Sequence, residues 1–449
     1  MKRALAAAVV LTALLALLLI VLAGRTSVER RAPAALAVGI ATGSAIAIDV
    51  EPVGLSIEYS LLARELGEGR CPPAALARAI RGLRAPTIRV GGDSQDQTAP
   101  VGTPPHAGVS DLPSGFWSRL GCLARETGSA VVVGLNLASG EPAWAATMAA
   151  DARAVIAPAR LTFELGNEPD IYGSHVPWWN GSALVRTPMP FATYLARARA
   201  LAAELGPDSS IEGPDFASGH WVKALPALAR TLHLSALDAH FYPLDACRSD
   251  AGSSAAALLT RAVQLKLDER VRVARDARAA GLPALISEAN SISCGGLAGI
   301  SDSPAAAVWA ARLVVTALRS GFEAVRFHSS GGAYDPFTLA GGRLTLRPLY
   351  LGLQAAAALI RPGSKLRAIA SAKALDGVAI ITAASTTDIL NNYTAIPRAA
   401  TVATLGPAHV EAIVAHPPTR REWTVTSAGG RALVTLPANS IVAITTASG

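Results

Sequence analysis

The sequence predicts an α/β protein, a (β/α)8 TIM barrel followed by an antiparallel β-sandwich domain. From about residue 51 to 360, short apolar runs alternate with longer helical patterns, as parallel strands with helical crossovers require. Eight such strands in about 300 residues match the size of a barrel. From residue 361 to 449, short β-type runs are separated by Gly, Pro and Asn, which favours a sandwich. A doubly wound open sheet would give the same alternation and remains the rival fold.

The predicted strands are short apolar runs of four to seven residues each. They are Val53–Tyr59, Pro86–Val90, Ala130–Leu135, Leu161–Leu165, Ile211–Pro214, Leu237–Phe241, Pro283–Ser287 and Ala324–His328. The predicted helices include 74–83, 115–126, 142–157, 192–204, 254–280, 304–319 and an eighth at 347–360. Several begin at a proline, as at Pro142 and Pro304, and others end at a glycine, as at Gly128 and Gly281.

The two ends of the chain are expected to join in the second domain. Residues 361–449 contain β-type runs at 377–381, 399–404, 422–425 and 441–444. Residues 31–50 have a similar apolar texture and could add a strand to that sandwich before the barrel begins.

The N-terminal 30 residues have the pattern of an export signal. Lys2 and Arg3 precede an apolar run from residue 4 to 23 that only Thr12 interrupts. The run is also long enough to span a membrane, so residues 1–30 are either a cleaved signal peptide or an uncleaved anchor. In both cases the positive charges stay inside and the body lies outside the cytoplasm, secreted or anchored.

The composition narrows the possible partners. Charged residues make up 16% of the 449 residues, the formal net charge is +7, and the arginines are scattered rather than grouped with aromatics. Nucleic acid is therefore not an expected partner. The chain lacks zinc-type Cys/His spacing, a phosphate loop, Rossmann glycines and a nucleophile-elbow serine, so we expect no metal and no cofactor.

A first candidate catalytic residue follows the fourth predicted strand. Residues 166–170 read Gly-Asn-Glu-Pro-Asp, and Pro169 cannot continue the strand ladder. Glu168 therefore lies at the carboxyl end of the strand, where barrels carry their active sites. Burial against apolar groups can raise the pKa of such a carboxyl so that it donates a proton near neutral pH. The alternative is that Glu168 only caps the next helix.

A second glutamate favours a catalytic role for Glu168 over a helix-capping role. Glu288 closes the seventh predicted strand, after the apolar run 282–287. Both glutamates then face the same mouth of the barrel. Two carboxyl groups on either side of a sugar ring are the minimum requirement for acid-catalysed glycoside cleavage. The alternative, a salt bridge at a strand end, would need two coincidences.

Five segments together resemble glycoside hydrolase family 79, the β-glucuronidases and heparanases, within the retaining clan A of (β/α)8-barrel glycosidases. They read Ser-Ile-Glu-Tyr-Ser at 56–60, Arg-Val-Gly-Gly-Asp-Ser at 89–94, Gly-Asn-Glu-Pro-Asp at 166–170, His-Phe-Tyr at 240–242 and Ser-Glu at 287–288. The resemblance includes the sandwich domain and covers most of the chain. It implies that Glu168 is the acid/base and Glu288 the nucleophile.

The resemblance also implies substrate-binding residues. Asn167 matches a residue that hydrogen-bonds the 2-hydroxyl of the sugar. Glu58 and Asp93, at the ends of the first two strands, are expected to accept hydrogen bonds from sugar hydroxyls. His240 and Tyr242 close the sixth strand, and the Tyr242 hydroxyl could orient the carboxylate of the nucleophile.

A uronic acid also needs a site for its carboxylate, which the family is expected to form from a glycine-rich loop and tyrosines. Gly295 and Gly296 follow the seventh strand, and Tyr334 follows the eighth. Cys247 and Cys294 follow the neighbouring strands six and seven, so a disulfide between them would hold this loop. Cys71 and Cys122 could pair or remain thiols.

The predicted function is a retaining hydrolase of uronic-acid glycosides or polysaccharides that works through a glycosyl-enzyme. Two alternatives remain open at this point. One is a clan A glycosidase for a neutral sugar, such as a xylosidase or glucosidase. The other is an inactive envelope protein that binds sugars on the same barrel.

Overall fold

The computed structural model describes residues 36–40, 44–104, 108–157, 160–247, 252–370, 375–404, 406–415 and 419–447. The apolar segment 4–23 lies outside these residues, so the choice between signal peptide and anchor stays a prediction. Among the helices within the described ranges, none has both the length and the apolar composition needed to cross a membrane.

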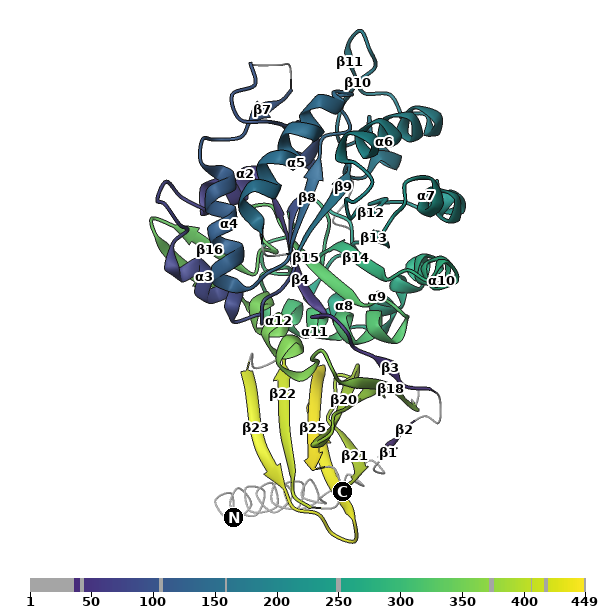
Figure 1. Cartoon of the computed structure of the whole chain (residues 1–449). Coiled ribbons are helices and arrows are strands. Elements are labelled where there is room, and N and C mark those ends of the chain that lie inside the picture. Colours follow the sequence, from purple (N-terminus) through teal and green to yellow (C-terminus); the bar gives the residue numbers. More distant parts are fainter. Residues whose placement is uncertain are drawn as a thin grey trace, which may run out of the picture. The chain divides into compact units, whose positions relative to one another are not determined.

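A ring of eight parallel strands forms the centre of the larger domain (Figure 1). In chain order they are β4 (Val53–Glu58), β5 (Ile88–Gly91), β8 (Val131–Leu135), β9 (Leu161–Leu165), β12 (Glu212–Gly213), β13 (Ala236–Phe241), β14 (Ala284–Ala289) and β15 (Ala324–Ser329). β15 pairs with β4, and a parallel bridge between Phe163 and Ile211 joins β9 to β12. The TIM barrel prediction is therefore confirmed, and the open-sheet alternative is wrong.

Helices surround the ring in the order expected for βα units. They are α2 (Tyr59–Glu65), α3 (Ala74–Arg81), α4 (Phe116–Thr127), α5 (Pro142–Ile156), α6 (Phe191–Leu205), α7 (Leu225–Thr231), α8 (Ala255–Leu258), α9 (Arg261–Leu265), α10 (Val271–Ala280), α11 (Pro304–Arg319) and α12 (Pro348–Leu359). Short 3-10 helices are η1 (Asp93–Gln97), η2 (Pro169–Ile171), η3 (Val222–Ala224) and η4 (Lys266–Arg270). Two-stranded ribbons pair β6 (Thr98–Ala99) with β7 (Ser110–Asp111), β10 (Trp178–Trp179) with β11 (Leu184–Val185), and β16 (Phe337–Ala340) with β17 (Arg343–Leu346).

The single helix predicted over residues 254–280 is wrong, because the structure divides it into α8, α9, η4 and α10. Ser254 and Thr260 each accept a hydrogen bond from the backbone N–H three residues later. Each hydroxyl therefore caps a new helix. The apolar periodicity continues through the break, which explains why the sequence pattern did not show it.

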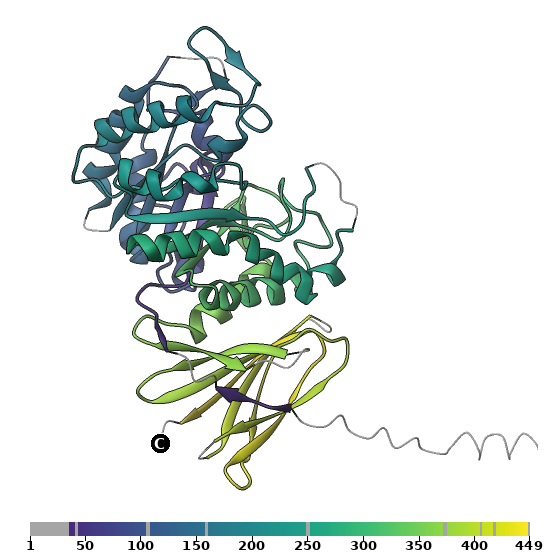
Figure 2. The same ribbon diagram turned by 90° about the vertical axis from the view of Figure 1, so that its right-hand side faces the viewer.

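The C-terminal strands pair with one another in antiparallel fashion and form two sheets (Figure 2). One contains β18 (Lys365–Ala370), β19 (Leu375–Ile381), β20 (Ser385–Asn392), β25 (Ser440–Ala447), β22 (Ala408–Val414) and β23 (Thr419–Val425). β2 (Gly39–Ile40) and β3 (Ile46–Ala47) pair with β18 in this sheet. The other consists of β1 (Leu36–Ala37), β21 (Arg398–Ala403) and β24 (Arg431–Leu436). The segment before the barrel thus pairs with strands at the opposite end of the sequence.

The interior of the barrel is polar. Leu55, Ile57 and Val90 are fully buried toward the helices, while alternate positions place charged groups inside the ring. These interior groups are buried to at least nine-tenths and include Arg89, Glu164, Glu212, Asp238 and Arg326. Many TIM barrels fill this space with branched apolar side chains. Here, ion pairs take their place.

A buried arginine connects the barrel to the sandwich. Arg312 of α11 is completely buried, and burial lowers its pKa to about 10. Its guanidinium donates hydrogen bonds to the carbonyls of Leu259 in the barrel and of Asn392 and Ser440 in the sandwich, at 2.7 to 3.1 Å. It also lies 4.5 Å from the centre of the Tyr393 ring.

Replacing this arginine is expected to destabilise the whole chain. Arg312→Met keeps most of the apolar stem but leaves three buried carbonyls without their donor, so the free energy of unfolding should fall by about 3 kcal/mol. Urea unfolding measures this change. Arg275→Met, at an exposed position of α10, is the matched control and should shift it by less than about 0.5 kcal/mol. Equal effects of the two substitutions would contradict this role of Arg312.

Candidate active site

A cavity of about 520 Å³ opens at the carboxyl ends of the barrel strands. Its lining comes from strand ends and from the loops that follow them. The lining residues are Glu58, Asp93, Glu168, Ile171, Ser174, His175, Ala217, His240, Tyr242, Leu244, Asp245, Cys247, Arg270, Glu288, Ser293, Cys294, Gly295, His328, Ser330 and Tyr334. Both predicted catalytic glutamates are among them. This is the end of the barrel that carries active sites in proteins of this fold.

Glu168 is placed by a tight turn after β9. Gly166 has φ 85°, and a Cβ there would come within 2.8 Å of Leu137 and Tyr172. Glu168 itself adopts the left-handed conformation with φ 52°, which costs a non-glycine residue about 1–3 kcal/mol. Its backbone N–H donates to the carbonyl of Asp215 at 3.0 Å, which helps to hold the turn. The strain is therefore localised at the residue whose side chain enters the cavity.

Glu288 is placed by an irregularity between two strands. Ala239 pairs with Ile286, but the next residue, His240, pairs with Glu288, so Ser287 is an extra residue in β14. Such bulges redirect side chains and are common beside active sites. The Ser287 hydroxyl donates to Asp215 at 2.9 Å, inside the barrel. The bulge brings the side chains of His240 and Glu288 to the same place.

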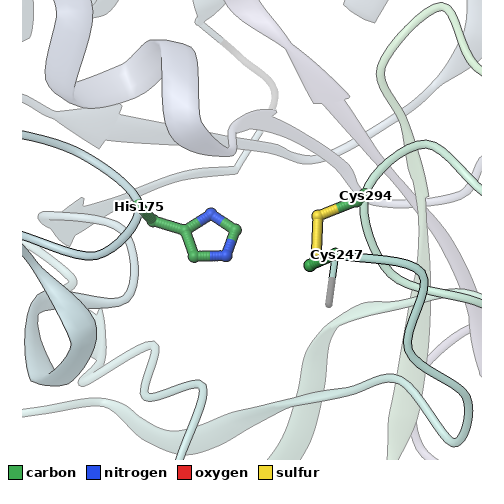
Figure 3. A group of neighbouring side chains, drawn as sticks. All are labelled: His175, Cys247 and Cys294. Carbon is green, nitrogen blue, oxygen red and sulfur yellow. A yellow bond between two sulfur atoms is a disulfide. The ribbon is translucent and has the colours of Figure 1, made fainter. Parts of the chain in front are cut away.

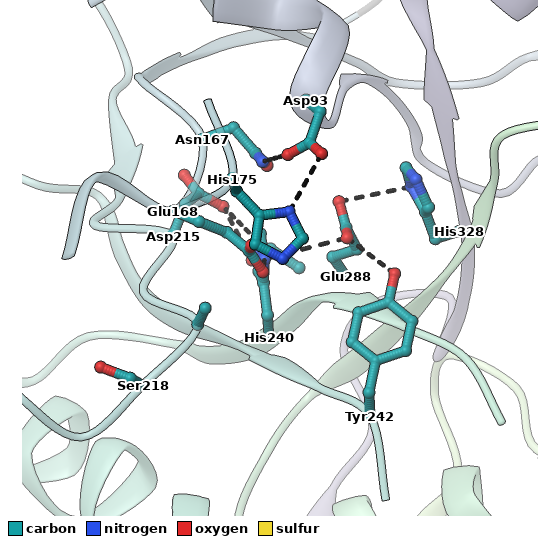
Figure 4. Close-up of polar contacts among 12 residues, drawn as sticks. Asp93, Asn167, Glu168, His175, Asp215, Ser218, His240, Tyr242, Glu288 and His328 are labelled. Atoms are coloured by element: carbon teal, nitrogen blue, oxygen red, sulfur yellow. Dashed lines mark hydrogen bonds and ion pairs between the residues drawn. The ribbon is translucent and has the colours of Figure 1, made fainter. Parts of the chain in front are cut away.

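The two glutamates face each other across a short gap (Figure 4). One carboxylate oxygen of Glu168, one of Glu288 and one ring nitrogen of His240 all lie within 4.8 Å of one another. The side chains come from the fourth, seventh and sixth strands of the ring. Because the ring is closed, strands far apart in sequence bring these groups together.

Cationic and hydroxyl partners stabilise the ionised form of Glu288. Burial alone would raise its pKa, but the charges of His328, His240 and Arg89, with the Tyr242 hydrogen bond, lower the pKa to about 2. The Tyr242 hydroxyl donates to Oε1 at 2.7 Å and Arg89 Nη1 donates to Oε2 at 2.7 Å. His328 Nδ1 lies 3.3 Å from Oε2. Glu288 is therefore a carboxylate at neutral pH.

Glu168 has the opposite electrostatic environment. Burial raises its pKa and the negative charge of Glu288 raises it further, while the hydrogen bond and charge of His240 act in the other direction. His240 Nδ1 lies 2.8 Å from Glu168 Oε1, and Nε2 lies 3.3 Å from Asp215 Oδ1. Two carboxyl groups whose pKa values are pushed apart can act as proton donor and nucleophile.

Arg89 connects Glu164, Asn167 and Glu288 inside the barrel. It is completely buried on β5 and donates to Glu164 Oε2 at 2.6 Å, to Glu288 Oε2 and to Asn167 Oδ1 at 3.0 Å. Burial would lower the pKa of the guanidinium, but Glu164, Asp215 and Glu288 raise it well above its ordinary value. Arg89 is therefore a permanent cation that sets the positions of both Glu288 and Asn167.

The predicted hydroxyl-binding residues occupy different layers of the site. Asp93 lines the cavity, accepts from Asn167 Nδ2 at 3.2 Å and lies 3.3 Å from His175 Nδ1. Asn167 is buried behind Asp93 and is not among the lining residues. Glu58 lines the cavity, but its carboxylate accepts from the backbone N–H groups of Asp93 and Ser94. Glu58 thus holds the start of η1 as well as facing the cavity.

The predicted loop residues and disulfide lie at the rim. Cys247 and Cys294 form a disulfide, and Cys71 pairs with Cys122. Gly295 and Tyr334 line the cavity, and the Tyr334 hydroxyl lies 3.1 Å from Ser330 Oγ. Gly296 is not among the lining residues, because it packs against Ser301. The disulfide therefore fixes a loop of which Gly295, but not Gly296, reaches the cavity.

Several site residues were not predicted from the sequence. His328 closes the eighth predicted strand, so the rule that identified Glu168 and Glu288 could have found it. Arg89 is a charged residue in the middle of a buried strand, which is itself a signal of an interior ion pair. Asp215 and His175 lie in loops, and no pattern in the sequence marks either one. Their positions depend on tertiary contacts.

Some of these groups have the geometry of metal ligands. Glu168, His240 and Glu288 are one such set, and His175 with Cys247 and Cys294 is another. In the second set both sulfur atoms belong to a disulfide, so they offer no thiolate. In the first set, His240 Nδ1 lies 2.8 Å from Glu168 Oε1, and Arg89 Nη1 lies 2.7 Å from Glu288 Oε2.

Comparison with solved structures supports the fold. A 4-O-α-L-rhamnosyl-β-D-glucuronidase from Fusarium oxysporum, in complex with Rha-GlcA, matches with TM-score 0.73 and 19% identity over 91% of this chain and 100% of its own. The GH51 arabinofuranosidase from Xanthomonas axonopodis pv. citri has TM-score 0.69 and 14% identity, over 92% and 100% of the two chains. The catalytic domain of GH30 xylanase C from Talaromyces cellulolyticus has TM-score 0.58 and 13% identity, over 92% and 99%.

Comparisons at the level of sequence found nothing. No protein-family model matches the chain, and no curated protein matches it. The solved structures above are all glycoside-cleaving enzymes by their names, but at these identities the likeness establishes the fold alone. The chemistry of this chain has to be argued from its own cavity.

Removing Arg89 should destabilise the protein in a pH-dependent way. Arg89→Met removes a buried cation that donates to both Glu164 and Glu288, so the free energy of unfolding at pH 7 should fall by about 3–5 kcal/mol. Arg89 lowers the pKa of Glu288 in the folded state, so this part of its stabilisation is complete above the unfolded value of 4.5. It is lost as the pH falls toward about 2.

Urea unfolding at pH 7, 4 and 3 measures this effect. The difference between the native chain and Arg89→Met should be largest at pH 7 and should shrink toward pH 3. Ser56→Ala is the control, because it removes no charge but does remove a hydroxyl that contacts Arg89 Nη1 at 2.9 Å and His328 Nδ1 at 3.0 Å. A difference that does not change with pH would contradict the ion-pair explanation.

Proposed function

We propose that this protein is a retaining glycoside hydrolase of the family 79 type that cleaves β-glucuronides. The observation that carries the proposal is the pair Glu168 and Glu288, because one carboxylate oxygen of each lies within 4.8 Å of the other across the cavity. Retaining enzymes place their two carboxyl groups about 5–5.5 Å apart, whereas inverting enzymes leave about 6.5–9.5 Å for a water molecule. The short separation favours direct attack by one carboxylate.

In the first step, Glu288 attacks the anomeric carbon of the sugar. Its lowered pKa keeps it ionised, and Tyr242 and Arg89 hold its two oxygens in place. Glu168 donates its proton to the glycosidic oxygen as that bond breaks, so the leaving group departs as an alcohol. The product is a covalent ester between the sugar and Glu288, with the configuration at the anomeric carbon inverted.

In the second step, Glu168 acts as a base. It is now a carboxylate, and it accepts a proton from a water molecule that attacks the anomeric carbon. The ester bond to Glu288 breaks and the carboxylate is regenerated. Loss of the Glu288 negative charge in the intermediate lowers the pKa of Glu168, because that charge raises it in the free protein. The pKa of Glu168 is thus higher in the first step, in which it donates a proton, than in the second step, in which it accepts one.

Specificity for a uronic acid is supported by the resemblance described above and by the rim loops. Gly295, Ser330 and Tyr334 line the cavity together and would offer a backbone amide and two hydroxyls to a sugar carboxylate. One structurally similar enzyme is itself named as a glucuronidase. We propose a carbohydrate substrate that carries uronic acid, with Asp93 and Glu58 facing its hydroxyls.

We also propose that the protein works outside the cytoplasm. The N-terminal sequence pattern suggests export, and two disulfides are compatible with an oxidising compartment.

Replacing either glutamate should abolish turnover of an aryl β-glucuronide. Glu288→Gln and Glu168→Gln should each lower kcat/KM by about 100-fold or more, since each removes one of the two reacting carboxyl groups. Glu323→Gln is the matched control, because Glu323 precedes β15 at the opposite end of the barrel. Normal turnover by either active-site variant would contradict the assignment.

Azide separates the two roles. With an activated aryl glycoside, azide should restore product formation by Glu168→Ala and give a glycosyl azide of retained configuration. With Glu288→Ala it should give the inverted glycosyl azide, because azide then replaces the nucleophile. Nuclear magnetic resonance distinguishes the two anomers.

A panel of aryl glycosides tests the sugar. We expect β-glucuronide to be cleaved at least about tenfold faster than β-glucoside, β-xyloside and α-L-arabinofuranoside, judged by kcat/KM, because the neutral sugars leave the carboxylate site unfilled. Faster cleavage of a neutral glycoside would keep the proposed chemistry but contradict the uronate specificity.

A further inference from the structure

The side chains of Asp93 and His175 and the Cys247–Cys294 disulfide form a bar across the rim of the cavity. The ring of His175 faces the Cys247–Cys294 disulfide (Figure 3), and one ring nitrogen and both sulfur atoms lie within 4.8 Å of one another. On its other side, His175 Nδ1 lies 3.3 Å from Asp93 Oδ2. Asp93 follows the second strand of the ring, and the cysteines follow the sixth and seventh. The bar therefore connects loops on opposite sides of the barrel.

His175 and the disulfide are both anchored to the fold. The His175 turn is held by the hydrogen bond from Gly173 N–H to the Val176 carbonyl at 2.8 Å. A Cβ on Gly173 would lie 2.3 Å from the Thr187 carbonyl, so this turn packs directly on the following loop. At the other end, Ser293 N–H donates to the Leu244 carbonyl at 3.0 Å, joining the two loops that the disulfide links.

No sugar ring can pass between His175 and the disulfide, or between His175 and Glu168. Heavy atoms in contact lie about 4.0–4.5 Å apart, so a separation under 4.8 Å leaves almost no free space. The same limit of 4.8 Å holds among His175, Asp93 and the carboxylate of Glu168 below. The gap between His175 and Glu168 is therefore also closed.

The lining of the cavity comes from most of the ring. Of the eight barrel strands, all but β8 contribute a described lining residue from the strand itself or from the segment that follows it. On that side, Asp96 accepts hydrogen bonds from the N–H groups of Leu137 and Ala138, and both of these residues are buried. The loop after β8 is thus packed against η1 beside the cavity and does not enter it.

We infer that His175 and the Cys247–Cys294 disulfide act as a barrier that confines the site to chain ends and small glycosides. A polysaccharide cannot lie across the rim with segments extending from both sides, so internal bonds are not cleaved. The inference rests on the proposed hydrolase function and assigns its cleavage mode. His175 and the two cysteines determine specificity without taking part in the bond changes.

The first test compares a small and a long substrate. The native chain is given 4-nitrophenyl β-D-glucuronide and, separately, a β-linked glucuronan, with the chain length followed by size-exclusion chromatography. We expect release of nitrophenol from the first and only terminal units from the second, with the polymer length nearly constant. A rapid fall in polymer length, with the aryl substrate also cleaved, would overturn the inference. Cleavage of neither substrate would instead contradict the proposed hydrolase function on which it rests.

The second test removes the barrier. Cys247→Ser/Cys294→Ser and His175→Ala should raise internal cleavage of glucuronan, relative to turnover of the aryl glucuronide, by about tenfold or more. Cys71→Ser/Cys122→Ser also removes one disulfide, but that disulfide is not among the cavity residues, so the ratio should stay the same. The ratio cancels losses in folded protein. An unchanged ratio in both barrier variants would overturn the inference.

Discussion

The interior ion pairs of Arg89 are the contacts on which both the barrel and its site depend. This one guanidinium, buried on the second strand, binds carboxylates from the fourth and seventh strands, Glu164 and Glu288. A charge so deep in the protein is stable only when it is paired, and the pairing fixes the relative positions of the strands. The same contact lowers the pKa of Glu288, while that carboxylate raises the pKa of Glu168 across the gap. The stability of the barrel and the ionisation of the two glutamates are thus linked through a single group.

Much of the fold could be predicted from the sequence, because parallel strands buried on both faces give short apolar runs. β4, β8 and β9 lie within the runs predicted for them, and α11 has the predicted limits. The failure at residues 254–280 has a local cause, since the cap at Thr260 begins a new helix inside a segment whose apolar spacing is unbroken. Propensity and periodicity describe one segment at a time, and capping competes with both.

Of the site, the sequence predicted those residues that end a strand. Glu168, Tyr242 and Glu288 lie at the cavity for this reason, because the carboxyl ends of parallel strands meet at one edge. Asn167 was expected to contact substrate, yet it lies one layer deeper, between Arg89 and Asp93. The position of His175 against a disulfide more than 70 residues later could not be inferred, since it depends on how two loops are held in space.

The central claim is that Glu288, held as a carboxylate by Arg89 and Tyr242, forms a covalent bond to the sugar. The most direct measurement uses 2-deoxy-2-fluoro-β-D-glucuronosyl fluoride, whose electron-withdrawing fluorine slows release of the intermediate. Mass spectrometry of peptides from the inactivated protein should find one sugar attached to Glu288. Attachment to Glu168 or to a residue outside the cavity would contradict the account. So would steady turnover of the reagent to a product of inverted configuration.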